Sequence, residues 1–455
     1  MSSSSPDSGV LKPSLGVFDV VAITVSAVTP ASSVFVIAPF AIQQAGSGAF
    51  LAFVIAGVLA LMFAWCYAEL GRAHSSAGGE YVYAKRVFGG TAGYATFLTV
   101  LVSLLFIPPV LATGAATYLN AALGTQFDTQ TVALVIVAAS YLLGILNIKV
   151  NAWITGACLL LEVAALLVIV VLGFGHATQP LSVLVQPQWL APGNLLSAAP
   201  WALVIGAVGT ALFSYNGFGG AVLLAEDMHD GGRTVHRAVL WSLALVLVIE
   251  LVPLTALLIG APSLQAMLSS PDPIGYLLTA HGNPTLSRLV SAGIFLSVFN
   301  AIVAIVIQVG RVIFSSGRDQ LWTPRMNRAF TRIHRRWGSP WLATLFLGVP
   351  SAALSFSSNL ADLTSFTVLL LVMVYLVVAL CALFSRVLRR DREHPYHMPL
   401  WPLPAMLAVL GAGYLLLNLL LAASHRDVMI ILGLLAVSVI LYSTYGRLSP
   451  AFQKL

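Results

Sequence analysis

Long apolar stretches dominate this chain, and short polar or charged segments separate them. A helix needs roughly 20 residues to cross a hydrocarbon core of about 30 Å, and the stretches have about that length. Within lipid each segment must satisfy its own backbone hydrogen bonds, which indicates helices rather than short alternating strands. The pattern predicts twelve transmembrane helices: 16–44, 48–70, 90–121, 130–147, 151–173, 197–226, 236–260, 285–315, 341–357, 361–386, 401–422 and 427–445.

The segments between the predicted spans are short. The longest, 174–196, 261–284 and 316–340, are too small for a nucleotide-binding or catalytic domain, which argues against a pump driven by ATP on the same chain. The Ser-rich, polar start of the chain, 1–15, predicts a cytoplasmic tail rather than a cleavable signal. We expect a second cytoplasmic tail at 446–455.

Composition and charge agree with a membrane protein. Of all residues 59% are hydrophobic and 8% are charged, whereas a soluble domain carries about 25% charged residues. If the N-terminus is cytoplasmic, only Arg288 and Arg426 of the 22 Lys and Arg residues fall outside the cell. This bias predicts a multi-pass protein of the cell membrane with both termini in the cytoplasm. The net charge of +6 then faces anionic lipid headgroups, and no nucleic acid is expected as a partner.

The first predicted span has a polar interruption near its middle, where Thr29, Pro30, Ala31, Ser32 and Ser33 follow one another. Proline cannot donate a backbone hydrogen bond and disturbs the preceding helical turn. A simple kink, with the serines bonded back to their own helix, remains an alternative to a functional break.

The sixth predicted span has a second interruption, for which a small-residue packing face is the alternative explanation. It reads Phe213, Ser214, Tyr215, Asn216, Gly217, Phe218. Spans one and six hold the same place in two successive five-span halves, which must have opposite orientations because five is odd. Broken helices at corresponding places in inverted halves indicate a substrate site between them. Free N–H groups there would attract an anion, and free carbonyl groups a cation.

Two carboxyl groups lie deep within predicted spans, and ionisable groups at such depth are functional by default. Glu162 and Glu250 each have apolar neighbours on both sides. Burial disfavours the charged form of a carboxyl, so each group is a candidate for proton uptake and release, or for a counter-charge to a cation. A structural carboxyl bonded to a neighbouring helix is the alternative for both. Asn300 and Gln308, in the eighth span, can also face the core.

The chain resembles the amino acid–polyamine–organocation (APC) superfamily of permeases over nearly its whole length. Five features carry the resemblance: the signature-like segment 75–83, the motif 213–217 with the acidic pair Glu226-Asp227, Arg311 with 318–321, Asn300, and the proline-spaced segment 395–402.

The resemblance implies an all-α membrane protein with a LeuT-type fold. In such a fold two inverted five-helix repeats, here 16–173 and 197–386, precede two C-terminal helices, here 401–445. It also implies a substrate held at the breaks of spans one and six, with walls from spans three, eight and ten. Many relatives couple transport to protons and others exchange substrates.

One departure from the family concerns the substrate. Relatives that bind an α-carboxylate commonly carry Gly-Ser-Gly in span one, where this chain has Ala31-Ser32-Ser33. The amides of these three residues remain as donors, but Pro30 supplies none. Thr-Pro at this point is similar to putrescine-type importers in the family.

We therefore expect a permease that imports amino acids by alternating access, coupled to protons rather than sodium, with a polyamine or biogenic amine importer or exchanger as the alternative. The predicted substrate-binding residues are Thr29 to Ser33, Phe213 to Phe218 and Asn300, with Tyr215 or Phe218 as an aromatic lid. Glu162 and Glu250 are the predicted proton-coupling or counter-charge residues. No cofactor or metal is expected, and the sequence leaves the oligomeric state open.

Channel, nutrient-sensor and enzyme functions are less consistent with the sequence. A channel would carry a continuous polar stripe along several helices, and these spans are too uniformly apolar. A sensor would usually carry a large cytoplasmic tail, whereas about ten residues follow the last span. No HExxH or GxSxG motif lies in a predicted span, which argues against an enzyme.

Overall fold

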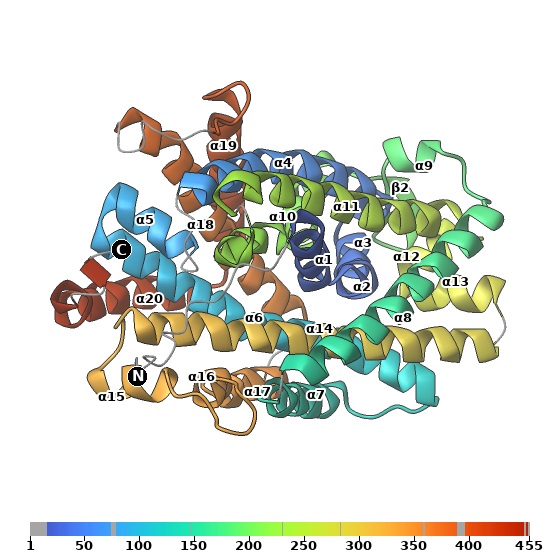
Figure 1. Ribbon diagram of the computed structural model, residues 1–455. Coiled ribbons are helices and arrows are strands. Elements are labelled where there is room, and N and C mark those ends of the chain that lie inside the picture. The colour runs from blue at the N-terminus through green and yellow to red at the C-terminus, as the bar shows by residue number, and fades with distance from the viewer. Residues whose placement is uncertain are drawn as a thin grey trace.

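The chain forms a bundle of helices with one small hairpin at its edge (Figure 1). The computed structural model describes residues 16–73, 79–146, 148–229, 231–282, 284–357, 360–388, 396–449 and 452–453. Residues 75–78 and 395, which carry part of the family resemblance, lie outside these ranges. So do residues 1–15, 450–451 and 454–455 of the expected tails.

The first half of the chain contains the broken first span and the helices after it. The elements are α1 (Val17–Val28), α2 (Pro30–Ser32), the π-helical η1 (Ser33–Ile37), α3 (Ala38–Ala45), the 3₁₀ turn η2 (Gly46–Gly48), α4 (Ala49–Ala73), α5 (Glu80–Phe88), α6 (Gly90–Leu123), α7 (Thr129–Gly144) and α8 (Ile148–Gly175). Asp128 caps α7, because its side chain accepts a hydrogen bond from the Thr131 amide.

The second half begins with a short helix and a hairpin before the helices resume. The elements are α9 (Ser182–Val185), β1 (Gln188–Ala191), β2 (Leu195–Ala198), α10 (Trp201–Ser214), the 3₁₀-helical η3 (Phe218–Asp227), α11 (Gly231–Ile259), α12 (Leu264–Ser269), α13 (Pro273–His281), α14 (Pro284–Arg318), α15 (Pro324–Phe330), α16 (Trp341–Leu345), α17 (Gly348–Ser357), α18 (Leu360–Val387), α19 (Leu403–Ala422), α20 (His425–Thr444) and η4 (Gly446–Leu448).

The hairpin corrects the expected start of the sixth span. Strands β1 and β2 pair antiparallel, with Gln188 opposite Ala198 and Ala191 opposite Leu195. The tight turn between them uses positive φ angles at Gly193 and Asn194, which these residue types tolerate best. Residues 197 and 198 therefore belong to a strand, and α10 begins only at Trp201, after Pro200.

Eight helical segments of the described chain are long and apolar enough to cross a membrane. The first of them, Val17–Ala73, contains two of the predicted spans, and three shorter apolar helices lie at the predicted spans four, five and nine. These lengths agree with a multi-pass membrane protein. The count of twelve crossings and the inverted repeat stay predictions.

The broken first span lies in the middle of the bundle (Figure 1). Helix α1 contacts α11 and α14, and α2 contacts α8 and α14. Helix α4 packs along α11 on one side of this centre, and α6 packs along α14 on the other. The interruption is therefore surrounded by protein, which is where irregular backbone is tolerated at membrane depth.

Candidate functional site

The first helix ends where the sequence predicts an interruption. Helix α1 stops at Val28, and Thr29 adopts a left-handed conformation with φ 58° and ψ 66°. A β-branched residue rarely adopts this conformation, so the surrounding structure must hold it in place. The helix restarts at Pro30 and continues through the wider π turn of η1 into α3. A full break, rather than a simple kink, therefore separates α1 from α2.

The second interruption lies directly against the first. Helix α10 ends at Ser214, and the chain turns through Tyr215 to Gly217 before η3. Gly217 has φ 121°, a backbone conformation that other residues avoid. A Cβ atom on Gly217 would lie 3.0 Å from Cγ2 and 3.2 Å from Cα of Val28, so the glycine also permits the close approach of the two breaks.

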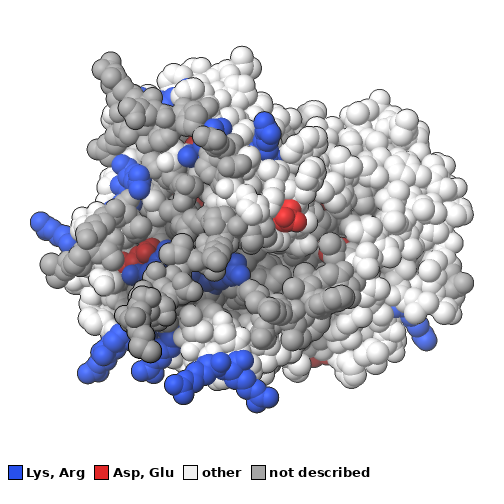
Figure 2. All heavy atoms as spheres, in the orientation of Figure 1, with Lys and Arg blue, Asp and Glu red and all other residues white. Residues whose placement is uncertain are grey.

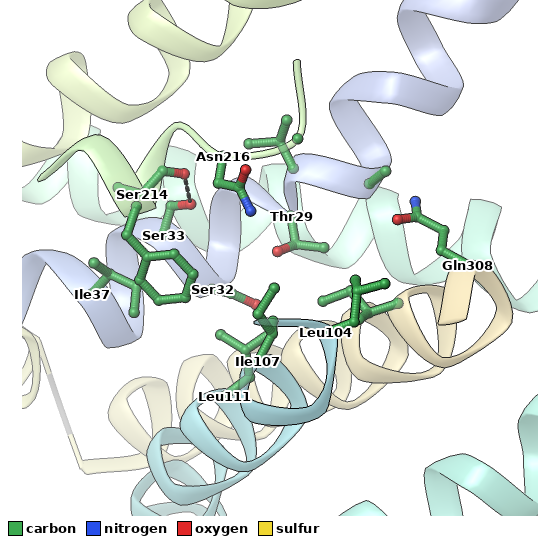
Figure 3. A pocket seen from close by; sticks show the side chains of 15 residues that line it. Thr29, Ser32, Ser33, Ile37, Leu104, Ile107, Leu111, Ser214, Asn216 and Gln308 are labelled. Atoms are coloured by element: carbon green, nitrogen blue, oxygen red, sulfur yellow. Dashed lines mark hydrogen bonds between the residues drawn. The ribbon is translucent and has the colours of Figure 1, made fainter. Parts of the chain in front are cut away.

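Serine side chains connect the two breaks. The Ser33 hydroxyl donates a hydrogen bond to the carbonyl oxygen of Ser214 at 2.7 Å, which Figure 3 marks with a dashed line. The Ser214 hydroxyl in turn donates to Oε2 of Glu250 at 2.6 Å. Glu250 comes from α11 and is fully buried. Two of the predicted substrate residues and one predicted carboxyl thus form one hydrogen-bonded chain.

The other predicted carboxyl lies at the restart of the first span. The Ala31 amide donates a hydrogen bond to Oε1 of Glu162 at 2.6 Å, and Glu162, from α8, is 6% exposed. We expected the amides of Ala31, Ser32 and Ser33 to be free for a substrate. That expectation is wrong for two of them in this conformation, because Glu162 accepts from Ala31 and the Thr29 carbonyl accepts from Ser33 at 3.1 Å.

A cavity of about 80 Å³ lies between the breaks. A single water molecule needs roughly 10–15 Å³ of such a cavity, so the space holds several waters or a small ligand. The polar side chains that line it are Thr29, Ser32, Ser33, Ser214, Asn216 and Gln308, and the apolar ones include Ile37, Leu104, Ile107, Leu111, Phe213 and Ile305. Figure 3 shows that the leucines and Ile107 come from one helix, α6. No charged side chain lines this cavity in the described part of the chain.

Several predicted site residues do not line the cavity. Pro30, Ala31 and Asn300 are absent from its wall, and so are both candidates for the lid. Tyr215 is fully buried and donates from its hydroxyl to the Phe53 carbonyl at 3.1 Å. Phe218 is fully buried between the rings of Tyr67 and Tyr375. Neither Tyr215 nor Phe218 therefore covers the cavity in this conformation, as we had expected of one of them. Phe213 is the aromatic side chain at the cavity.

The remaining walls come from residues that the sequence analysis could not assign. Nothing in the sequence distinguishes the apolar cavity residues from the other apolar residues of the spans; they are Leu104, Ile107, Leu111 and Ile305. They line the cavity because the face of each helix that carries them turns inward. Asn216, which the sequence did single out, accepts a hydrogen bond from the Tyr375 hydroxyl of α18 at 3.2 Å. This bond connects the second break to a distant helix.

A second polar cluster lies on α5 and at the end of α14. The Tyr81 hydroxyl donates to Oδ2 of Asp319 at 2.5 Å, and Nε of Arg318 lies 3.5 Å from Oδ1 of the same carboxylate. Burial raises the pKa of Tyr81 well above its usual range, and the Asp319 charge acts in the same direction. Burial likewise raises the pKa of Glu80, which accepts a hydrogen bond from Tyr67 at 2.9 Å. The cluster connects the signature-like segment to the end of α14.

The chain is similar in sequence to known membrane transporters. The family described as amino acid permease matches residues 15–442. An uncharacterized transporter of Mycobacterium tuberculosis is 25% identical over 89% of this chain and 90% of its own length. The branched-chain amino acid permease BcaP of Bacillus subtilis is 22% identical over 96% and 94%. The serine/threonine exchanger SteT of Bacillus subtilis is 21% identical over 81% and 82%.

Proposed function

This chain belongs to the amino acid permease family, within the APC superfamily of membrane transporters, and from that premise we propose that it imports an amino acid by alternating access, coupled to protons. The family and these relatives are transporters and not enzymes. The observation that carries the proposal is the contact between two helix breaks around a cavity, at Thr29 and at Gly217. Breaks of this kind supply unpaired backbone groups to a substrate at membrane depth.

The proposal includes the architecture that the sequence predicts. Residues 16–173 and 197–386 would form two inverted five-helix repeats, with 401–445 as two further spans and both termini in the cytoplasm. The positions of the breaks support this arrangement, because each lies in the first span of its repeat. Rocking one group of helices against the other would then expose the cavity to each side of the membrane in turn.

The cavity wall supports a small substrate with an apolar side chain. Most of its polar part, including Ser32, Ser33 and Asn216, comes from the breaks, and much of its apolar part comes from α6. The relative named as a branched-chain amino acid permease fits such a wall. We propose L-leucine as the first substrate to test, with L-serine second because another relative is named a serine/threonine exchanger.

A biogenic amine or polyamine is the second candidate. One observation favours it: the Ala31 amide already donates a hydrogen bond to the Glu162 side chain, so in this conformation that amide is not free for a substrate carboxylate. Glu162 and Glu250 would then act as counter-charges behind an uncharged wall. The two candidate substrates differ in one group: an amino acid carries a carboxylate, and an amine does not.

Uptake into proteoliposomes tests the function. We expect labelled L-leucine to accumulate faster with pH 5.5 outside and pH 7.5 inside than with pH 7.5 on both sides, and a protonophore to remove the difference. Protein-free liposomes are the control. Unlabelled L-serine and putrescine serve as competitors: inhibition by putrescine alone would favour the amine. If labelled L-leucine, L-serine and putrescine, each supplied in turn, all lack gradient-stimulated uptake, proton-coupled transport of these substrates is refuted.

The same assay tests the coupling role of Glu162. Replacement by Gln keeps the size of the side chain and an acceptor for the Ala31 amide but removes the titratable group. We expect Glu162→Gln to transport L-leucine without stimulation by the pH gradient. Stimulation equal to that of the wild-type protein would exclude Glu162 as the coupling group.

A further inference from the structure

The hydrogen bond between Ala31 and Glu162 occupies the position that best suits an anion in the broken first span. Pro30 has no N–H group, so the Ala31 amide is the first donor of the helical stretch that restarts after Thr29. The N-terminal end of a helical stretch carries partial positive charge and favours a carboxylate. Here a side chain of the protein, buried and 2.6 Å from the amide, supplies that carboxylate.

The cavity reaches the residue next to this hydrogen bond. Ser32 follows Ala31 directly, is 1% exposed and lines the cavity, as Figure 3 shows. Its hydroxyl oxygen is buried and has no hydrogen-bond partner within the described residues. A buried hydroxyl without a partner is costly unless a ligand or water satisfies it. The neighbouring hydroxyl of Ser33 is already committed to Ser214. Ser32 therefore offers a ligand one donor beside the Ala31 amide.

Two carboxylates cannot share the Ala31 donor in such surroundings. Like charges within a few ångströms disfavour each other's ionised form, and burial strengthens the effect. A substrate carboxylate can take the donor only if Glu162 gives up its charge. We propose that Glu162 is a tethered competitor for the substrate carboxylate, which must take up a proton and release Ala31 before a carboxylate-bearing substrate binds there. This inference rests on the proposed transport function and specifies its coupling step.

The step balances in charge and in protons. One proton from the water on the open side binds the Glu162 carboxylate, and the Ala31 amide exchanges one carboxylate acceptor for another. The total charge around the amide is the same before and after. On the other side of the membrane Glu162 loses the proton, recovers the amide and expels the substrate. The scheme therefore couples one proton to each carboxylate that is carried.

The described residues of the helices packed against α8 include one other buried carboxyl group, Glu250. Helix α8 packs against α2, α11, α13 and α14. Glu250 of α11 is buried and accepts a hydrogen bond from the Ser214 hydroxyl. The other ionisable groups described on these elements and on α8 are His176, His236, Arg237, Tyr276, His281, Arg288, Arg311 and Arg318. The three arginines of α14 are exposed, and the His176 and His281 rings stack with each other at the C-terminal ends of α8 and α13.

Binding measurements on the wild-type protein test the competition directly. Isothermal titration calorimetry would compare L-leucine with 3-methylbutylamine, which is L-leucine without its carboxylate, at pH 5.5, 6.5 and 7.5. L-Serine and ethanolamine form a second pair. The charge of each ligand is constant over this range. We expect the Kd of each amino acid to rise with pH, by up to about tenfold per unit for one linked proton. The Kd of each amine should stay constant or fall, because ionised Glu162 attracts a cation.

Glu162→Gln then assigns the effect, with Glu162→Asp as the variant that keeps a titratable group. In a folded Glu162→Gln protein L-leucine affinity should no longer change with pH, whereas Glu162→Asp should keep a pH dependence. Equal pH trends for amino acid and amine in the wild-type protein would overturn the competition, even if Glu162→Gln failed to fold. A pH dependence of L-leucine affinity that persists in Glu162→Gln would also overturn the competition. In either case, uptake of L-leucine by the wild-type protein would still support the transport function. Failure of all four ligands to bind at any pH would count against the transport function itself.

Discussion

Two residues with uncommon backbone conformations lie at the centre of the molecule. Thr29 and Gly217 both have positive φ angles, and the glycine lies against Val28, the residue before Thr29. Such conformations persist only where the surroundings hold them, and they often occur at functional sites. Thr29 and Gly217 both line the cavity. At this scale the site depends on backbone shape as much as on side-chain chemistry.

Gly217 and Gly220 provide a matched pair of substitutions. Alanine at 217 would hold an unfavourable φ and would lie 3.0 Å from Val28, which should cost about 1–3 kcal/mol or displace the breaks. Alanine at 220 would meet no atom within 4 Å. We expect Gly217→Ala to lose most L-leucine uptake and to lower the apparent unfolding temperature, and Gly220→Ala to retain both. Similar behaviour of the two variants would argue against a strained break at Gly217.

An ion pair between a buried carboxylate and a partly buried guanidinium joins helices that are far apart in the sequence. Nε and Nη2 of Arg386, at the end of α18, donate to the two oxygens of Glu69 on α4 at 2.5 and 2.7 Å. The Met398 amide, just before α19, donates to the same carboxylate at 2.8 Å. Arg386 also lies over the ring of Trp401, 5.1 Å from its centre. Helix α4, helix α18 and the segment just before α19 thus meet at one carboxylate.

A double-mutant cycle measures this connection. Removal of one partner leaves a buried charge without its counter-charge, which typically costs about 3–5 kcal/mol, whereas removal of both can be nearly neutral. We expect Arg386→Met to lower the apparent unfolding temperature strongly, and Glu69→Gln combined with Arg386→Met to recover part of the loss. Simple additivity of the two single substitutions would show that the pair is not coupled.

At the scale of the whole molecule, the visible face shows an uneven distribution of basic side chains (Figure 2). On the face that Figure 2 presents, most Lys and Arg side chains gather toward the end that holds α5 and α15, and the opposite end is almost free of them. Helices α19 and α20 expose most of their apolar surface, with Leu410, Leu421 and Met429 among the exposed side chains. This combination suits a molecule whose apolar sides face lipid and whose basic end faces the cytoplasm.

Cysteine labelling of intact cells tests that orientation. Arg426 lies at the start of α20 and Arg335 lies between α15 and α16, and both are exposed. A membrane-impermeant maleimide should label Arg426→Cys without permeabilisation and Arg335→Cys only after it. The unmodified protein, which contains Cys66, Cys158 and Cys381, gives the background labelling, and two of these residues, Cys66 and Cys381, are buried. The reverse labelling pattern would place the termini outside the cell.

The sequence by itself determined the helical, membrane-spanning character of the chain and the position of both breaks. Apolar stretches of spanning length leave the backbone few alternatives to helix. Pro30 removes a donor and Gly217 permits a φ that other residues avoid, so the residue types mark where each helix can end.

Only the tertiary structure decided which groups meet at the breaks. The hydrogen bonds of Glu162 to Ala31 and of Glu250 to Ser214 join residues that are far apart in the chain. The direction in which a helix turns decides that Phe213, rather than Tyr215 or Phe218, faces the cavity. The apolar wall from α6 could not be read from the sequence for the same physical reason. In a helix that is apolar on every side, the residue types do not mark which side faces the substrate and which faces lipid.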